Sequence, residues 1–120
     1  MELRAELASA KDNERIGELV LHETPEQRVW LISLPPGQRL PFHCHRRDYL
    51  WLSLTDGKAI SRRDDGTTHE VHYLKGDCRQ ISIRTANDVF IHDLTNHGEA
   101  VLGFLTVEFF STLRVKLSQH

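Results

Sequence analysis

The sequence lacks several features that would place it in a familiar class of proteins. It has no apolar run long enough to span a membrane, and residues 1–11 have no apolar central region such as a signal peptide needs. Its 15 Lys and Arg are balanced by 17 Asp and Glu without a block of like charge, which argues against a nucleic-acid binder. Two cysteines, Cys44 and Cys78, are too few for a disulfide framework. We therefore expect a cytoplasmic protein that enters no membrane and binds no nucleic acid.

The motifs of several common enzyme classes are also missing. No Ser-His-Asp or Cys-His pattern supports a hydrolase. No Gly-rich loop offers a phosphate site, because Gly37, Gly57, Gly66 and Gly76 all fall in expected turns. The sequence has no internal repeat, low-complexity tract or interior linker. A chain of 120 residues with this organisation is expected to form a single domain.

What the sequence does contain is a series of short, strand-like segments. A stretch rich in Glu, Leu and Ala at residues 2–10 predicts a short helix, with an extended arm as the alternative. The expected strands after it are residues 16–22, 28–34, 40–45, 49–54, 58–63, 67–74, 80–84, 89–95 and 101–110. Roughly eight to ten short strands with regular turn signals predict an all-β sandwich or barrel. The expected parts are 1–14 as an N-terminal arm or short helix, 15–110 as the barrel, and 111–120 as a C-terminal extension or edge strand.

One short stretch carries the clearest chemical signal. His43 and His45 are separated by a single residue in a segment that is expected to be extended. Alternate residues of a strand point to the same face, so these two imidazoles would project together, with Phe42 and Cys44 on the other side. Two imidazoles on one face can bind a divalent transition metal if a third ligand comes from elsewhere. The alternative is a pair of surface histidines.

The third ligand is suggested by a resemblance that extends over about residues 16–108. The first motif of the cupin superfamily is a glycine, five residues, His-x-His and a later hairpin glycine, and it reads here Gly37, His43, His45 and Gly57. The second motif opens on Gly-Asp and ends in His-x-x-x-Asn, and it reads here Gly76, Asp77, His92 and Asn96. The chain thus resembles small, single-domain RmlC-like cupins of the cupin-2 type. This resemblance implies a jelly-roll barrel, the cupin double-stranded β-helix, with a metal held by His43, His45 and His92.

The sequence departs from the cupin pattern at two points. The family's glutamate ligand is expected four or five residues after the second histidine, where this chain has Tyr49 and Leu50. Asp48 comes one residue too early, so on a regular strand it would point away from the histidines. The second motif is also stretched, with 15 residues between its glycine and its histidine. We therefore expect a longer loop around residues 85–87.

The three-histidine set has consequences for chemistry. Three neutral imidazoles leave a divalent ion with open positions for water or substrate, which is typical of catalytic sites. Imidazole suits Fe, Zn, Ni and Cu, and the missing carboxylate makes Mn less expected. Resemblance to small cupins implies dioxygenases, isomerases, lyases or binding modules. We expect a metal-dependent enzyme acting on a small, carboxylate-bearing organic molecule. The alternatives are a non-catalytic ligand-binding cupin and a metal-free, sugar-epimerase-like cupin with His43 as base and Tyr49 as acid.

Several other side chains have two interpretations. Tyr49, at the position of the missing glutamate, is the candidate catalytic residue as a proton donor, and its alternative role is a ring in the core. Surface positions without a ligand role are expected for His69, His72 and His97. Core positions rather than substrate platforms are expected for Trp30, Trp51 and Phe104. Arg39, Arg79 and Arg84 are candidates for a guanidinium clamp on a carboxylate or phosphate, and the alternative is solvated surface positions.

The end of the chain predicts a partner. Residues 112–117 alternate apolar side chains with Arg114 and Lys116, and an unpaired strand of this kind favours pairing with another chain. Small cupins that resemble this sequence commonly pair through a sheet and often exchange terminal strands. We therefore expect a homodimer, and the alternative is a tail that folds back on its own barrel.

Overall fold

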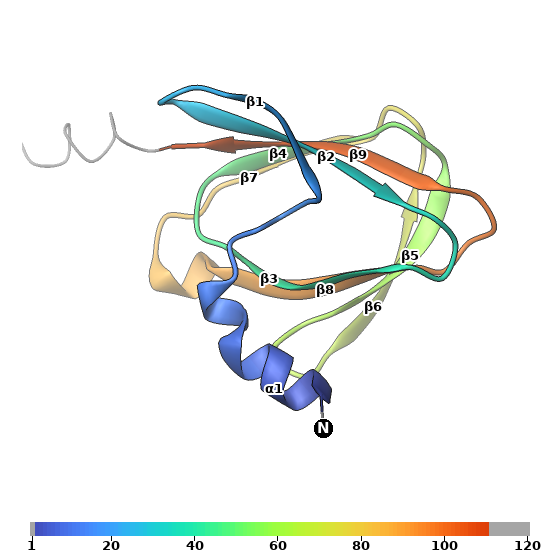
Figure 1. Ribbon diagram of the computed structural model, residues 1–120, viewed down its shortest axis with the longest axis horizontal. Coiled ribbons are helices and arrows are strands. Elements are labelled where there is room, and N and C mark those ends of the chain that lie inside the picture. Colours follow the sequence, from blue (N-terminus) through green and yellow to red (C-terminus); the bar gives the residue numbers. More distant parts are fainter. Residues whose placement is uncertain (1, 111–120) are drawn as a thin grey trace, which may run out of the picture.

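A computed structural model describes residues 2–110, which form two antiparallel sheets preceded by a short helix (Figure 1). The strands are β1 (Leu19–Glu23), β2 (Gln27–Leu34), β3 (Arg39–His45), β4 (Tyr49–Ser53), β5 (Gly57–Arg62), β6 (Thr68–Tyr73), β7 (Cys78–Ile81), β8 (Phe90–Asn96) and β9 (Leu102–Phe109). One sheet has the order β1-β2-β9-β4-β7 and the other the order β3-β8-β5-β6. The expected all-β barrel is confirmed.

The helix α1 (Glu2–Ser9) and the 3-10 turn η1 (Ala10–Asp12) confirm the short helix expected at residues 2–10. The helix lies outside the sheet that contains β3 and β8 (Figure 1). Asn13 follows and pairs with the free edge of β3, because its carbonyl accepts from the Cys44 N–H (2.7 Å) and its side-chain amide donates to the Phe42 carbonyl (2.9 Å). The chain then crosses to the other sheet, with Ile16 buried in the core on the way. The N-terminal segment thus links both sheets.

The core lies between the sheets and is built from alternate residues of each strand. β2 and β9 pair along their whole length, and their inward side chains include Trp30, Ile32 and Phe104, all of which are buried. Alternation puts one face of each strand on the core and the other on the outside. The expected core positions of Trp30 and Phe104 are confirmed, and Trp51 packs against the same cluster while partly exposed.

Two strands differ from the sequence-based expectation by more than one residue at an end, for local reasons. β1 starts at Leu19, three residues later than expected, since Ile16 turns into the core instead of continuing an edge strand. β7 spans Cys78–Ile81 and not residues 80–84. The Ile83 N–H donates to the buried Asp48 carboxylate (2.7 Å) and therefore does not pair with a neighbouring strand. The expected longer loop contains a second 3-10 turn, η2 (Ala86–Asp88).

Two expectations concern the ends of the chain and membranes. The proposed C-terminal extension, residues 111–120, with its alternating tail lies outside the described residues. Within residues 2–110, no helix has the length and apolarity that a bilayer-spanning helix requires.

Candidate metal centre

A turn with a left-handed glycine sets the start of the strand that carries the two histidines. Gly37 has φ of +80°, a conformation that side chains with a Cβ rarely adopt, and the Gln38 N–H donates to the Pro35 carbonyl (3.0 Å) across this turn. The turn directs β3 along the barrel wall. His43 and His45 then point inward together and are 2% and 3% exposed.

An irregularity in β3 fixes the orientation of His43. The pairing of β3 with β8 shifts between Leu40 and His43, where Pro41 has no N–H to give to the ladder. The Pro41 carbonyl lies 2.8 Å from Nδ1 of His43. Because a carbonyl only accepts, Nδ1 carries the proton, and the neutral ring presents the lone pair of Nε2 to the barrel interior.

His92 comes from the neighbouring strand. It is the register partner of His43 on β8, so the two side chains share the inner face of the sheet. Its Nδ1 shares a hydrogen bond with the hydroxyl of Ser61 on β5 (2.9 Å). Each of these rings is therefore held at Nδ1 by a neighbour, which turns its Nε2 toward the other ring.

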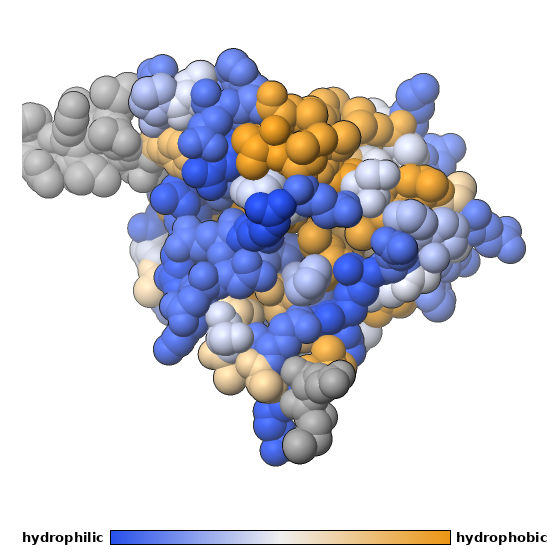
Figure 2. Space-filling view, in the orientation of Figure 1, coloured by the Kyte–Doolittle hydropathy of each residue, from blue (hydrophilic) through white to orange (hydrophobic). Residues whose placement is uncertain are grey.

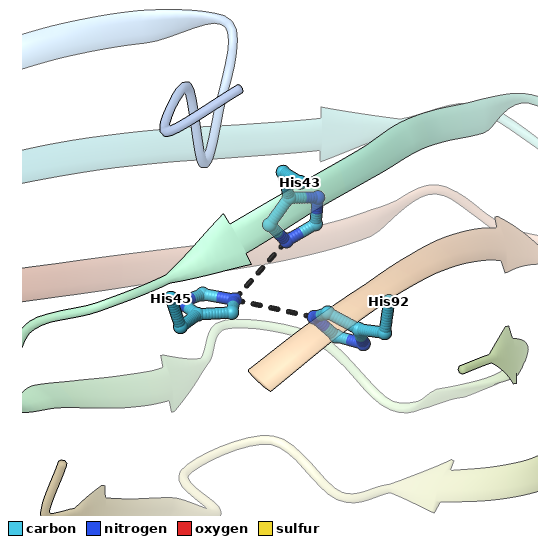
Figure 3. A group of neighbouring side chains, drawn as sticks. All are labelled: His43, His45 and His92. Carbon is cyan, nitrogen blue, oxygen red and sulfur yellow. Dashed lines mark hydrogen bonds between the residues drawn. The ribbon is translucent and has the colours of Figure 1, made fainter. Parts of the chain in front are cut away.

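The three rings converge on one point, as Figure 3 shows. Nε2 of His45 lies 3.1 Å from Nε2 of His43 and 3.2 Å from Nε2 of His92. Ring nitrogens of all three residues lie within 4.8 Å of one another. A metal–nitrogen bond of about 2.0–2.1 Å implies ligand nitrogens about 2.8–3.4 Å apart for angles between octahedral and tetrahedral. The two short separations fall in that range.

Hydrogen bonds between the rings cannot satisfy all three Nε2 atoms. Nε2 of His45 is one sp² nitrogen with a single in-plane site, which holds either a proton or a lone pair. It cannot form linear hydrogen bonds to both His43 and His92, although it is close to both. A cation bound among the three rings would be held by the lone pairs of His43, His45 and His92. The donor set therefore fits a divalent transition metal.

Burial keeps the three imidazoles neutral, as metal ligands must be. It lowers the pKa of His43 from 6.5 to about 4. The pKa of His45 falls well below its usual value, first through burial and then through its two histidine neighbours. The pKa of His92 is lowered by burial, by His43 and by the positive charge of Arg63.

Tyr49 lies beside this centre. Its side chain is buried, and its ring stacks on that of His45 with centroids 4.1 Å apart. Phe90 packs near the same imidazole (5.9 Å), and Nδ1 of His45 has no hydrogen-bond partner among the described residues. Ring packing therefore orients His45. Burial raises the pKa of Tyr49, although the charges of Arg63 and Arg79 oppose this shift.

The histidines and Tyr49 face a cavity of about 420 Å³ between the sheets. Its wall is mostly apolar and includes an aromatic cluster, in which the rings of Trp51 and Tyr73 are 5.4 Å apart and those of Tyr73 and Phe104 are 4.7 Å apart. Cavities of this size hold small organic molecules. Trp51 and Phe104 therefore serve both the core and the cavity wall.

Some expected residues lie elsewhere, and others were missed. Arg39 does not line the cavity, because its guanidinium binds Glu6 and Asp93 on the outside of the sheet. Among the lining residues that were not predicted as part of the site are Ser61, Arg63 and His69. Alternation along the segments 58–63 and 67–74 predicts which side chains share one face of each strand. It does not predict which other strands lie opposite that face. His72 and His97 are outside this cavity, as expected.

Solved structures of cupins are similar to this fold. A cupin domain from Bordetella pertussis Tohama I has a TM-score of 0.67 and 18% identity, covering 77% of this chain and 90% of that one. An RmlC-like cupin family protein with a double-stranded β-helix fold from Methanocaldococcus jannaschii has a TM-score of 0.60 and 18% identity, covering 86% and 91%. A Cupin 2 conserved barrel domain protein from Salinispora arenicola CNS-205 has a TM-score of 0.56 and 18% identity, covering 85% and 82%. The chain therefore has the cupin double-stranded β-helix fold.

The cupin resemblance read from the two motifs is thus confirmed at the level of the fold. No family model matches the sequence, and no curated protein matches it. The cupin barrel brings the two half-motifs together on adjacent strands, with His43 and His45 on β3 and His92 on β8. In this chain Tyr49 stands where the cupin motif has its glutamate, and its ring lies against that of His45.

Proposed function

We propose that this cupin is a metal-dependent enzyme that acts on a small organic molecule. The observation that carries the proposal is the convergence of three neutral imidazole nitrogens at the wall of a 420 Å³ cavity. Three protein ligands leave positions at the ion for a ligand molecule in the cavity. When bound there, the metal supplies Lewis acidity that polarises an oxygen of that molecule.

The chain's own residues supply orientation and a proton in this proposal. The Pro41 carbonyl and the Ser61 hydroxyl hold two of the ligand rings at Nδ1, and such outer contacts keep metal ligands in position. Tyr49 keeps its phenolic proton at neutral pH, because burial raises its pKa, and is proposed as the proton donor to the bound molecule. The mostly apolar cavity wall would contact the body of the bound molecule.

The proposed metal is Fe, Zn, Ni or Cu, and Mn is less favoured. An all-imidazole donor set suits the borderline ions, whereas Mn favours carboxylate and water oxygens. The metal-binding group contains no carboxylate among the described residues.

The first prediction is metal occupancy that depends on the three histidines. Protein purified without added metal should contain close to one equivalent of a transition metal by elemental analysis. His45→Ala should lose most of it, because it removes the nitrogen between the other two. The control, His72→Ala, removes an exposed histidine that pairs with Glu70 and should leave metal content unchanged. Equal metal content in wild type and His45→Ala would refute the proposal.

A non-catalytic binding module is the second candidate, since the same cavity can hold a ligand without converting it. The two functions separate by assay on metal-loaded protein. Turnover of a small carboxylate that disappears in Tyr49→Phe favours the enzyme. Tight binding that Tyr49→Phe does not abolish, without chemical change, favours the module.

We also propose a homodimer in the cytoplasm. Cys44 is buried and Cys78 is exposed, and both are free thiols, which agrees with a reducing compartment. The dimer is supported by an aliphatic outer face of the five-stranded sheet.

A further inference from the structure

A charged side chain lies next to the histidine cluster on the cavity wall. Arg63 follows the end of β5 and forms a single antiparallel bridge with His92. Partners in such a bridge place their side chains on the same face, so the guanidinium of Arg63 lies on the inner side of the barrel beside His92. It lines the cavity, and its charge contributes to the shifts in pKa of both His92 and Tyr49.

This arginine forms no ion pair among the described residues. Hydrogen bonds from Thr67, and to a smaller extent the charge of Arg63, lower the pKa of the exposed Asp65, which does not line the cavity. Nε of Arg63 is buried without a hydrogen-bond partner among the described residues, and none of the ion pairs in that part of the chain involves Arg63. Its guanidinium instead lies over the ring of Phe90, 4.6 Å from the centroid. A buried donor without an acceptor is unfavourable, so this position favours an acceptor brought by a ligand.

The preceding residue, Arg62 at the end of β5, provides a comparison. Arg62 points to the outer face, where its Nε and NH2 groups donate to the Asp93 carboxylate at 3.0 and 2.6 Å. Two adjacent arginines therefore differ sharply, since one is neutralised by a buried carboxylate and the other faces a cavity. The unmatched charge is on the cavity side.

The other charges at the cavity do not neutralise Arg63. Arg79 on β7 also lines the cavity and adds a second guanidinium. Asp88 is a carboxylate on the lining, but it accepts the backbone N–H groups of Arg84 and Thr85 at 3.0 Å each, as part of a capping box. With neutral histidines, the cavity therefore carries a positive field that attracts anions.

We infer that Arg63 is the specificity-determining residue for the carboxylate group of a small monocarboxylate ligand with an apolar or aromatic body. The inference rests on the proposed function, since it assigns the class of molecule that occupies the same cavity. A planar guanidinium fork matches the two oxygens of a carboxylate. The aromatic cluster of Trp51, Tyr73 and Phe104 offers a surface for the rest of the molecule.

The test uses two probes of the same shape that differ in charge, benzoate and benzamide. Their affinities for zinc-loaded protein are measured by isothermal titration calorimetry. Benzoate should bind wild type at least about tenfold more tightly than benzamide, because hydrogen bonds to charged groups exceed neutral ones. Arg63→Gln should weaken benzoate binding about 10- to 100-fold with little effect on benzamide. Arg63→Lys should fall between, since it keeps the charge without the planar fork.

A charge-matched control separates this effect from the overall charge of the protein. Arg4→Gln removes one positive charge from an exposed position on α1 and should leave benzoate affinity unchanged. Unchanged benzamide affinity in Arg63→Gln would show that the cavity is intact.

Three results would overturn the inference: no saturable benzoate binding up to its solubility limit, equal affinities for benzoate and benzamide, or full benzoate affinity in Arg63→Gln. Metal analysis of the same samples keeps the two proposals apart. Metal-loaded protein that does not discriminate charge would reject the role of Arg63 alone. Charge-selective, Arg63-dependent binding in protein that holds no metal would reject the metal proposal and leave the carboxylate site standing.

Discussion

At the scale of single residues, the two tyrosines of the sequence show how the cavity sets their chemistry. Tyr49 and Tyr73 both line it. Burial raises the pKa of Tyr73 to about 12 and raises that of Tyr49 as well, for which burial is again the largest cause. Both phenols are therefore neutral donors at physiological pH. Neither is pre-ionised as a base.

The raised pKa values predict a loss of stability in alkali. The folded protein holds both phenolic protons more tightly than the unfolded chain, whose tyrosines have a pKa of about 10. Stability is therefore full below about pH 10 and falls as pH rises toward the folded-state pKa, by up to about 1.4 kcal/mol per pH unit for each tyrosine. Tyr49→Phe removes one of these contributions.

Urea unfolding of wild type and Tyr49→Phe at about pH 9, 10 and 11 measures the difference. The other titrating groups are the same in both proteins, so the comparison isolates Tyr49. The variant should lose less stability between pH 10 and 11 than wild type does. The same loss in both proteins would show that Tyr49 is not desolvated.

At the scale of elements, α1 and β3 act as one unit at the irregular part of the strand. Glu6 of α1 accepts hydrogen bonds from the Arg39 guanidinium and from the Phe42 N–H (2.7 Å). Arg39 also donates to Asp93 (2.8 Å), whose carboxylate is fully buried. The helix therefore satisfies a backbone donor within the irregular stretch of β3, immediately before His43.

Removing the Glu6 carboxylate should loosen this part of β3. Glu6→Ala should lower the free energy of unfolding by about 1–2 kcal/mol, the scale of charge-assisted hydrogen bonds at a partly exposed site. It should also speed hydrogen exchange of the Phe42 amide. Glu26→Ala, which removes an exposed carboxylate near β2, is the control and should change neither. Unchanged Phe42 exchange in Glu6→Ala would contradict the proposed link between α1 and β3.

These elements also show what the sequence could predict. Period-two alternation indicates strands and their buried faces, as at Trp30 and Ile32, because it reflects local geometry. The spacing of the two cupin motifs also predicts that His92 lies close to His43 and His45. Contacts between side chains on different strands were not predicted, because they depend on which strands become neighbours. The positions of Ser61 and Arg63 beside His92 require β5 to lie next to β8, and no local pattern specifies that pairing.

At the scale of the whole molecule, the outer face of the five-stranded sheet is unusually apolar. Two aliphatic rows cross it in register, one through Leu19, Leu31, Leu105 and Leu52, and one through Val29, Val107 and Leu50. Leu19 and Leu21 on the edge strand β1 are 53% and 50% exposed. Figure 2 shows this region as an orange surface over β1 and the strands beside it. Contiguous apolar patches of this kind favour association.

A second copy of the chain is the proposed partner of this face, because an isologous contact would bury the same rows on both subunits. Light scattering should give about twice the 13.9 kDa mass of one chain. Leu105→Glu places a charge at the centre of the sheet face and should shift the protein to monomer. Leu74→Glu, at a 66% exposed position outside these rows, should leave the dimer intact. A wild-type mass near one chain would refute the dimer.

The central place of β9 also has a kinetic consequence. This strand lies between β2 and β4, so the sheet that starts at Leu19 stays incomplete until Phe109 is available. Pairings that join residues so far apart in sequence slow folding, since a long loop must close before they form. On the ribosome, β2 and β4 should therefore each lack one neighbouring strand while the rest of the barrel is synthesised. Nascent chains that stop before β9 should remain sensitive to protease, and protection should appear in one step once residues 102–109 have left the exit tunnel.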